Sequence, residues 1–214
     1  NSRARILNLN NGNSGMIVKE AVSVLLQREL VIFPTDTVYG IFGLPDPEVI
    51  SKIIEVKDRD NKPIPVLFSE LSKVSEYFRI ILPDWIDSFT DKFWPGPFTL
   101  ILDSETEVPG ITLNGSIGIR QPGYLPALEV ISGAGGVLGV TSANISGNPG
   151  EDDPAKIEEV FRRKVGLIVR IPEVPGNPST VIKYHKDSIE IMRKGKKDLK
   201  KLEDFFKECG LTMR

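Results

Sequence analysis

The chain has very few of the residues that build disulfides and metal centres. Its 214 residues include one cysteine, Cys209, and one histidine, His185. A single cysteine cannot form an internal disulfide, and without a cluster of thiolates and imidazoles we expect no zinc or iron site. The sequence therefore favours a reducing compartment and a reaction that uses no cysteine or histidine nucleophile.

Long apolar runs and an excess of either charge are also missing. No window approaches the ~20 apolar residues that span a bilayer, and the opening "NSRARILNLNNGNSG" has no signal-peptide core. We expect a soluble, cytoplasmic protein with no membrane partner. The chain has 27 basic and 29 acidic residues. Because its net charge is near zero, any attraction to polyphosphate or RNA must come from a local cluster of basic residues.

Helical and strand patterns alternate along the chain. Residues 16–29 place apolar side chains on one helical face, and "LVIF" then switches to a strand pattern. In 46–57, Asp46 is a predicted N-cap and Pro47 a predicted first helical residue. Further helices are expected at 71–78, 84–92, 125–132, 155–163 and 199–209, and strands at 63–68, 98–102, 117–120, 137–140, 167–169, 180–184 and 189–193. With no repeat and no long linker, this order predicts one α/β or α+β domain over residues 1–214, built around one mixed sheet.

Polar runs follow four of the predicted strands. "PTDT" follows "LVIF", "RQPG" follows "SIGI", "TSANISG" follows "VLGV", and "RKG" follows "IEIM". Each run alone is explained by turn chemistry, because Ser, Thr, Asn and Asp bond their own backbone. Four together indicate a polar cleft that orients an anionic ligand, since ligands collect beyond the carboxyl ends of strands.

The segment "KDRDNKP" places Lys57 and Arg59 just past a predicted helix. One reading is a solvated helix end, where cations favour the negative pole of the helix dipole. The other is a polyphosphate site, for which an ammonium and a guanidinium fork are well suited. The chain has no Walker A run and no GxSxG elbow.

Seven motifs carry a family resemblance. "PTDTVYG", "KDR", "WPGPFTLIL", "GIRQP", "TSANISG", "PSTVI" and "RKG" occur in this order over nearly the whole chain. Together they resemble the single-domain YrdC-like threonylcarbamoyl-AMP synthases. The resemblance implies a twisted mixed sheet with helices around a deep basic cavity. It also implies an enzyme that joins L-threonine, bicarbonate and ATP, with Mg²⁺ expected, into L-threonylcarbamoyladenylate and pyrophosphate.

The resemblance assigns roles to individual residues and partners. Residues matching the family's catalytic, triphosphate-binding tetrad are Lys57, Arg59, Ser142 and Asn144. Residues matching its threonine contacts are Thr35, Arg120 and Ser179, and Arg193 matches a nucleotide contact. A tRNA threonylcarbamoyl transferase complex would then carry the product to adenosine 37 of tRNA. We expect Thr35 and Thr37 on the cavity floor, with Asp36 fixing the turn between them.

Two positions depart from the family pattern. "KDRDNKP" is shorter than usual and has Asp60 in place of a proline, which leaves the roles of Asn61 and Lys62 open. Some relatives carry a threonine-contacting histidine where this chain has Leu67, so we expect that contact to be absent.

Two other functions remain to be weighed. One is a non-enzymatic, translation-associated protein that uses a basic cavity to bind tRNA or double-stranded RNA; near-neutral charge and the lack of an aromatic-interleaved basic stripe disfavour it. The other is a carbamoyl-adenylate enzyme of hydrogenase maturation. Those domains sit in longer chains with zinc-binding and acylphosphatase segments, and neither is visible here.

Overall fold

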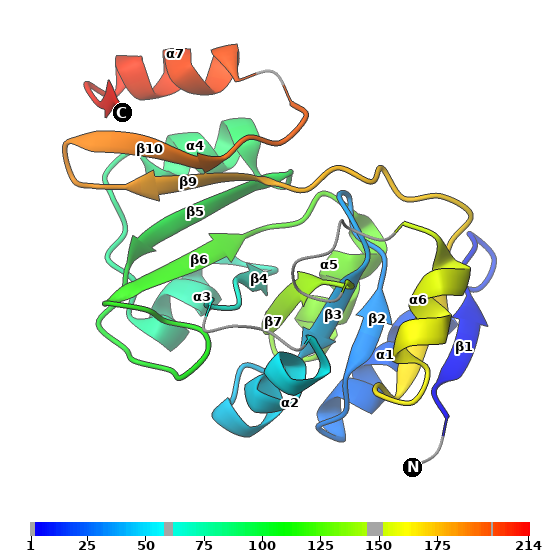
Figure 1. The fold of residues 1–214 in the computed structure, drawn as a ribbon. Coiled ribbons are helices and arrows are strands. Elements are labelled where there is room, and N and C mark those ends of the chain that lie inside the picture. The colour runs from blue at the N-terminus through cyan, green and yellow to red at the C-terminus, as the bar shows by residue number, and fades with distance from the viewer. Residues whose placement is uncertain (1–2, 58–61, 145–151, 198) are drawn as a thin grey trace.

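The computed structural model describes residues 3–57, 62–144, 152–197 and 199–214 (Figure 1). The strands are β1 (Arg5–Asn8), β2 (Val31–Phe33), β3 (Gly40–Gly43), β4 (Val66–Phe68), β5 (Phe98–Asp103), β6 (Ser116–Arg120), β7 (Val137–Ser142), β8 (Leu167–Arg170), β9 (Thr180–Tyr184), β10 (Ser188–Arg193) and β11 (Thr212–Met213). The helices are α1 (Ser14–Leu26), α2 (Pro47–Lys57), α3 (Leu71–Phe78), α4 (Ile86–Phe93), α5 (Leu125–Gly133), α6 (Pro154–Phe161) and α7 (Lys200–Glu208).

All the strands belong to one mixed sheet. Their order is β1-β8-β2-β3-β7-β4-β6-β5-β9-β10-β11, with parallel and antiparallel neighbours in the same layer. The predicted mixed α/β architecture is confirmed. The one sheet contains strands from near both ends of the described chain, β1 and β11. The boundary of a single domain over 1–214 stays a prediction.

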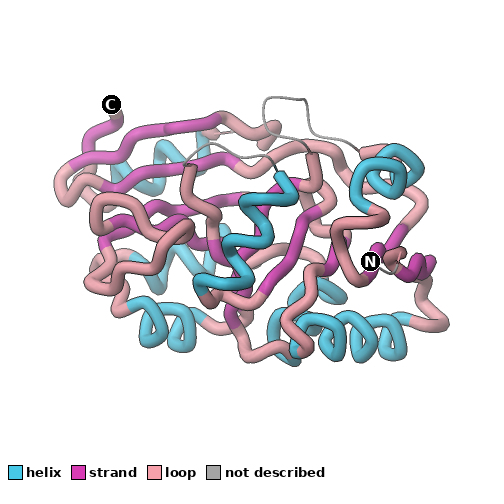
Figure 2. Tube along the Cα trace, turned by 60° about the horizontal axis from the view of Figure 1, so that its bottom comes forward, coloured by secondary structure: helices cyan, strands magenta, loops and turns pink. Residues whose placement is uncertain are grey.

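Strand alternation separates the apolar side chains into two groups. Val31 and Phe33 pack with α1 and α5, while Ile32 between them packs with the cluster that includes α2 and α6. Successive strand side chains point to opposite faces, and both faces are covered, which is why "LVIF" reads as an unbroken apolar run. Figure 1 shows α1 and α5 behind this part of the sheet and α2 and α6 in front, and Figure 2 shows the strands as one layer against which helices pack.

The predicted helices and strands are confirmed within a few residues at each end. In α2, Pro47 is the first helical residue, and the main-chain N–H of Val49 donates to the Asp46 carboxylate at 3.2 Å. This bond satisfies one of the free N–H groups at the helix start.

Three strands were missed. β1 lies in the polar opening and forms an edge strand parallel to β8. β3 reads "GIFG", and glycine disfavours strands. Its glycines are needed for close packing, because a Cβ at Gly40 would lie 2.7 Å from a Val140 methyl and one at Gly43 would lie 2.8 Å from a Val49 methyl. β11 has only two residues. Neighbouring strands, rather than local propensity, decide these elements.

Candidate active site

Lys57, Ser142 and Asn144 form one hydrogen-bonded cluster. The Lys57 ammonium donates to the Ser142 main-chain oxygen at 2.8 Å, to the Ser142 hydroxyl at 3.3 Å and to Asn144 Oδ1 at 3.0 Å. The Ser142 hydroxyl donates to the same Asn144 oxygen at 2.5 Å. The structure thus brings together three residues of the predicted tetrad, while the fourth, Arg59, lies outside the described residues.

The helix pattern explains why this lysine is buried. Ile50, Ile53 and Lys57 are spaced three and four residues apart, so they lie on one face of α2. That face packs on the sheet, and Lys57 is 2% exposed. Its side chain reaches the end of β7, whose register with β3 pairs Ser142 with Gly40. Lys57 is therefore not a solvated residue at a helix end.

The roles of Asn61 and Lys62 were left open by the sequence. Asn61 lies outside the described residues, and Lys62 is exposed, so its role stays open.

Arg120 occupies a second polar cluster, at the end of β6. One guanidinium nitrogen lies 2.7 Å from the Asp36 carboxylate and 3.4 Å from the Gly96 carbonyl oxygen. The other donates to the Thr37 hydroxyl at 3.2 Å. The side chains of Arg120 and Asp36 are 7% and 14% exposed, so this ion pair is largely shielded from water.

The turn between Thr35 and Thr37 is held by Thr35, and not by Asp36 as we expected. The Thr35 hydroxyl donates to the Val38 carbonyl oxygen at 2.7 Å and accepts from the Thr37 main-chain N–H at 3.1 Å. The carboxylate of Asp36 instead leaves the turn to pair with Arg120. Asp36 is thus a residue of the site that turn chemistry alone did not reveal.

Ser179 and Arg193 are joined directly. Arg193 donates to the Ser179 main-chain oxygen at 3.0 Å and to its hydroxyl at 3.1 Å. The Thr99 hydroxyl lies 2.9 Å from the same Ser179 hydroxyl. Sequence analysis missed Thr99, because it lies inside the apolar strand "FTLIL" and carries no local signal of a site.

Arg193 and Arg120 are close enough to influence each other. Burial lowers the pKa of Arg193, and the positive charge of Arg120 lowers it further. Among the described residues, Arg193 forms no ion pair with a carboxylate. Of the two guanidinium groups, only that of Arg120 pairs with a described carboxylate, Asp36. Among the described residues the cluster therefore carries an excess of positive charge, which suits an anion.

The four polar strand ends, which we expected to form a polar cleft, do not lie at one edge of the sheet. β2 and β7 run in one direction, whereas the ladders β7-β4 and β4-β6 make β6 run in the other, together with β10. Strand direction is a property of the pairing and cannot be read from polar runs.

Sheet twist nevertheless carries the ends of β2 and β6 together. Four steps separate these strands in the sheet, and a twist of roughly 20 to 25° at each step adds up to roughly 80 to 100°. Figure 1 shows β2 running across the direction of β6. The Asp36–Arg120 ion pair joins the two strand ends. Binding of one ligand by both polar clusters stays a prediction.

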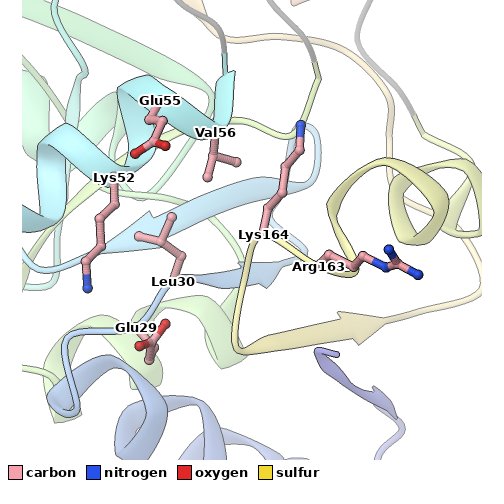
Figure 3. A pocket seen from close by; sticks show the side chains of 7 residues that line it. All are labelled: Glu29, Leu30, Lys52, Glu55, Val56, Arg163 and Lys164. Atoms are coloured by element: carbon pink, nitrogen blue, oxygen red, sulfur yellow. The ribbon is translucent and has the colours of Figure 1, made fainter. Parts of the chain in front are cut away.

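Two hollows are lined by residues that belong to none of these clusters. One of about 270 Å³ is lined by Glu29, Leu30, Lys52, Glu55, Val56, Arg163 and Lys164 (Figure 3). It lies beside α2, its charged side chains are mostly exposed, and Arg163 points away from the helix that carries Lys52. The other, of about 360 Å³, is lined by Lys92, Phe93, Lys201, Asp204, Phe205 and Glu208. A deep basic cavity at the candidate site stays a prediction.

The described part of the chain has neither a cluster of metal ligands nor a membrane-spanning helix. There, no three His, Cys, Asp or Glu side chains group as metal ligands. His185 lies 2.8 Å from Glu190 on the β9-β10 hairpin. No helix in the described ranges has both the length and the apolar character to cross a bilayer.

Comparison with known proteins decides the family. The Sua5/YciO/YrdC domain model, described as telomere recombination, matches residues 23–195. The chain belongs to this family. A relative from Methanocaldococcus jannaschii, provisionally named a threonylcarbamoyl-AMP synthase, is 30% identical over 207 residues that cover 94% of this chain and 97% of its own.

Some relatives are longer than this chain. The threonylcarbamoyl-AMP synthases of Pyrococcus abyssi and Bacillus subtilis are 28% and 30% identical, and the matches cover 91% and 83% of this chain but 58% and 53% of theirs. The crystal structure of P. abyssi Sua5 complexed with L-threonine superposes with a TM-score of 0.88 at 26% identity, covering 99% of this chain and 63% of that one. The chain therefore spans a little more than half of these longer relatives.

Proposed function

We propose that the protein is an L-threonylcarbamoyladenylate synthase. It condenses L-threonine, bicarbonate and ATP to threonylcarbamoyl-AMP and pyrophosphate, and is therefore a nucleotidyltransferase. The observation that carries this proposal is the cluster of Lys57, Ser142 and Asn144, whose members come from α2 and from the end of β7. Relatives named for this activity, and one solved with L-threonine, support it.

The Lys57 cluster binds the triphosphate in this proposal. Lys57 supplies a cation in a mostly buried setting, where its attraction to phosphate oxygens is stronger than in water. The Ser142 hydroxyl and the Asn144 amide add neutral hydrogen bonds. Arg59 contributes a second cation on the strength of the family resemblance.

The Arg120 cluster binds threonine. Arg120 faces the amino-acid carboxylate, Ser179 supplies a hydroxyl beside it, and Thr35 helps to shape the same pocket. Arg193 contacts the nucleotide. Its hydrogen bonds to Ser179 link the threonine and nucleotide halves of the proposed site, so the two substrates lie side by side.

The chemistry requires alignment more than covalent help. The amine of threonine forms a carbamate, either with bicarbonate and release of water or with carbon dioxide and release of a proton. A carbamate oxygen then attacks the α-phosphorus of ATP, forming one P–O bond while the bond to pyrophosphate breaks. Positioned cations lower the barrier by neutralising the phosphate oxygens and holding the reactants in line. No protein nucleophile takes part.

Mg²⁺ fits this site only as part of a nucleotide complex. Mg²⁺ is often held by substrate phosphates and water with one or two carboxylates. Ser142 and Asn144 offer neutral oxygens, and the Asp36 carboxylate is engaged by Arg120. These residues would hold Mg²⁺ through the triphosphate, where the ion would neutralise phosphate charge.

The product would pass to a tRNA threonylcarbamoyl transferase complex for modification of adenosine 37. That role places the protein in the cytoplasm and allows contact with tRNA or double-stranded RNA. A non-enzymatic RNA-binding function is not favoured.

The decisive experiment measures pyrophosphate release and, by mass spectrometry, a threonine-dependent adenylate. Release that requires threonine and bicarbonate together supports the proposal. ATP hydrolysis that depends on neither threonine nor bicarbonate, with no adenylate formed, contradicts the proposal.

A further inference from the structure

The Asp36–Arg120 ion pair is built from two segments that are distant in the chain. The residues are 84 positions apart, and the carboxylate and guanidinium meet at 2.7 Å. A shielded pair of this kind gives a planar guanidinium a fixed orientation, because the carboxylate accepts from one nitrogen in a set direction. Asp36 therefore decides where the other nitrogen of Arg120 points.

That other nitrogen begins a chain of hydroxyl groups with a fixed direction. Thr35 has one hydroxyl proton, and it is donated to the Val38 carbonyl oxygen, which can only accept. The 3.0 Å contact between the Thr35 and Thr37 hydroxyls must then be donated by Thr37. Thr37 in turn accepts from Arg120 at 3.2 Å, so the bonds run from Arg120 through Thr37 to Thr35.

Counting lone pairs distinguishes the two threonines. The Thr35 oxygen accepts from both the main-chain N–H and the hydroxyl of Thr37, so its two lone pairs are used. The Thr37 oxygen accepts from Arg120 and keeps one lone pair. In this arrangement Thr37 can accept a further hydrogen bond, whereas any contact of Thr35 with a ligand falls to its main chain.

We propose that Asp36 is a positioning residue, and that through Arg120 it orients the Thr37 hydroxyl as a hydrogen-bond acceptor for the substrate amino acid. The Thr37 oxygen then accepts a hydrogen bond from the hydroxyl or ammonium group of threonine. Asp36 itself touches no substrate. The inference rests on the proposed function, because it assigns the Arg120 cluster to threonine.

Three variants separate positioning from general stability. Asp36→Asn keeps the shape but removes the charge that orients Arg120, and Thr37→Val removes the acceptor at nearly constant volume. Asp36→Glu restores the charge on a longer arm. Glu105→Gln is the matched control, because Glu105 pairs with Arg79 at 2.9 Å in an exposed ion pair away from the site.

The measurement is the KM for threonine and for ATP in the joint pyrophosphate assay, with melting temperature as a check on folding. We expect Asp36→Asn to raise the threonine KM about tenfold, the effect of one charge-assisted hydrogen bond, with the ATP KM changed less than about twofold. Asp36→Glu should recover part of this loss. The Asp36→Asn/Thr37→Val double variant should be little worse than the more severe single variant, because both act through one bond chain.

Three results would overturn the positioning role: equal changes in both KM values, a change no larger than that of Glu105→Gln, or effects that multiply in the double variant. If Asp36→Asn fails to fold, Thr37→Val and Asp36→Glu decide the question, and unchanged threonine KM in both rejects it. Failure of the proposed function is distinct, since the unaltered protein would then release no pyrophosphate in response to threonine.

Discussion

The ammonium of Lys57 lies 2.8 Å from the main-chain oxygen of Ser142, although 85 positions separate the two residues. The contact ties the last turn of α2 to the end of β7. A residue that binds phosphate in our proposal therefore also holds two elements of the fold together, and its replacement has two consequences.

Replacing Lys57 should impair both activity and stability. We expect Lys57→Met to lower kcat/KM by about 30- to 1,000-fold, since losing a charged contact to a desolvated phosphate costs ~2 to 4 kcal/mol. The melting temperature should fall by about 3 to 10 °C, because buried acceptors lose a donor worth roughly 1 to 3 kcal/mol.

Lys52→Met is the control for this prediction, since Lys52 lies on the same helix and bonds the Arg28 main-chain oxygen away from the site. Steady-state kinetics and thermal unfolding of both variants test the assignment. A fully active Lys57→Met protein would remove the basis for the ATP site. Arg59→Ala should lose activity comparably if the resemblance assigns it correctly.

Ser142→Ala should have a smaller effect than Lys57→Met. Its hydroxyl is neutral, and the main-chain oxygen that receives the closest Lys57 contact is kept. A neutral hydrogen bond is worth roughly 1 kcal/mol, so about a fivefold to tenfold loss of kcat/KM is expected. A loss equal to that of Lys57→Met would show that the hydroxyl has a larger role than a neutral contact.

Ser179→Ala and Arg193→Ala should differ in which substrate they affect. Removing the Ser179 hydroxyl should raise the KM for threonine more than that for ATP. Arg193→Ala should raise both, because Arg193 bonds Ser179 as well as facing the nucleotide in our proposal. Initial rates with each substrate varied in turn make the comparison, and an effect of Ser179→Ala on ATP alone would contradict the placement of threonine.

Valine should be a poor substrate. A pocket that pairs the threonine hydroxyl leaves a buried polar group unpaired when valine binds, and such pockets discriminate by factors of up to about 10⁴ to 10⁵. Competition between threonine and valine in the adenylate assay measures the ratio. Comparable turnover of the two amino acids would exclude a hydroxyl-reading pocket.

Gly176→Ala should destabilise the loop that is hydrogen-bonded to the Thr37 turn. Gly176 has φ +76° and donates its N–H to the Thr37 carbonyl oxygen at 2.8 Å. An added Cβ would lie 2.5 Å from an Asp152 carboxylate oxygen, and the left-handed conformation itself costs a non-glycine residue about 1 to 2 kcal/mol. We expect unfolding free energy to fall by at least about 1 kcal/mol and the threonine KM to rise.

The helical Gly15 provides the matched control, because a Cβ there would meet nothing within 4 Å. Gly15→Ala should be neutral or stabilising by up to about 1 kcal/mol. Urea unfolding of both variants provides the comparison. Equal effects at the two sites would show that the Gly176 conformation is not under constraint.

The sequence was sufficient for features that local physics controls. Apolar periodicity located the helices and most strands, and Asp46 with Pro47 marked the start of α2. The sequence also contained a signal for the burial of Lys57, because this residue continues the apolar helix face of Ile50 and Ile53. Its charged neighbours, however, suggested a solvated helix end. The seven ordered motifs indicated the family and the residues to examine.

Tertiary structure decided what depends on pairing across the chain. The direction of β6 relative to β7 follows from the strand pairing. The sequence therefore could not show that the polar ends of β2 and β6 lie at opposite edges of the sheet and are brought together by sheet twist. β3 needed its neighbours to define it, since its glycines serve packing against Val140 and Val49. The partners of Asp36 and Thr99 lie about 80 positions away. Residues this distant become neighbours only when the sheet forms, because hydrogen bonds and ion pairs depend on distance in space and local sequence patterns carry no such distance.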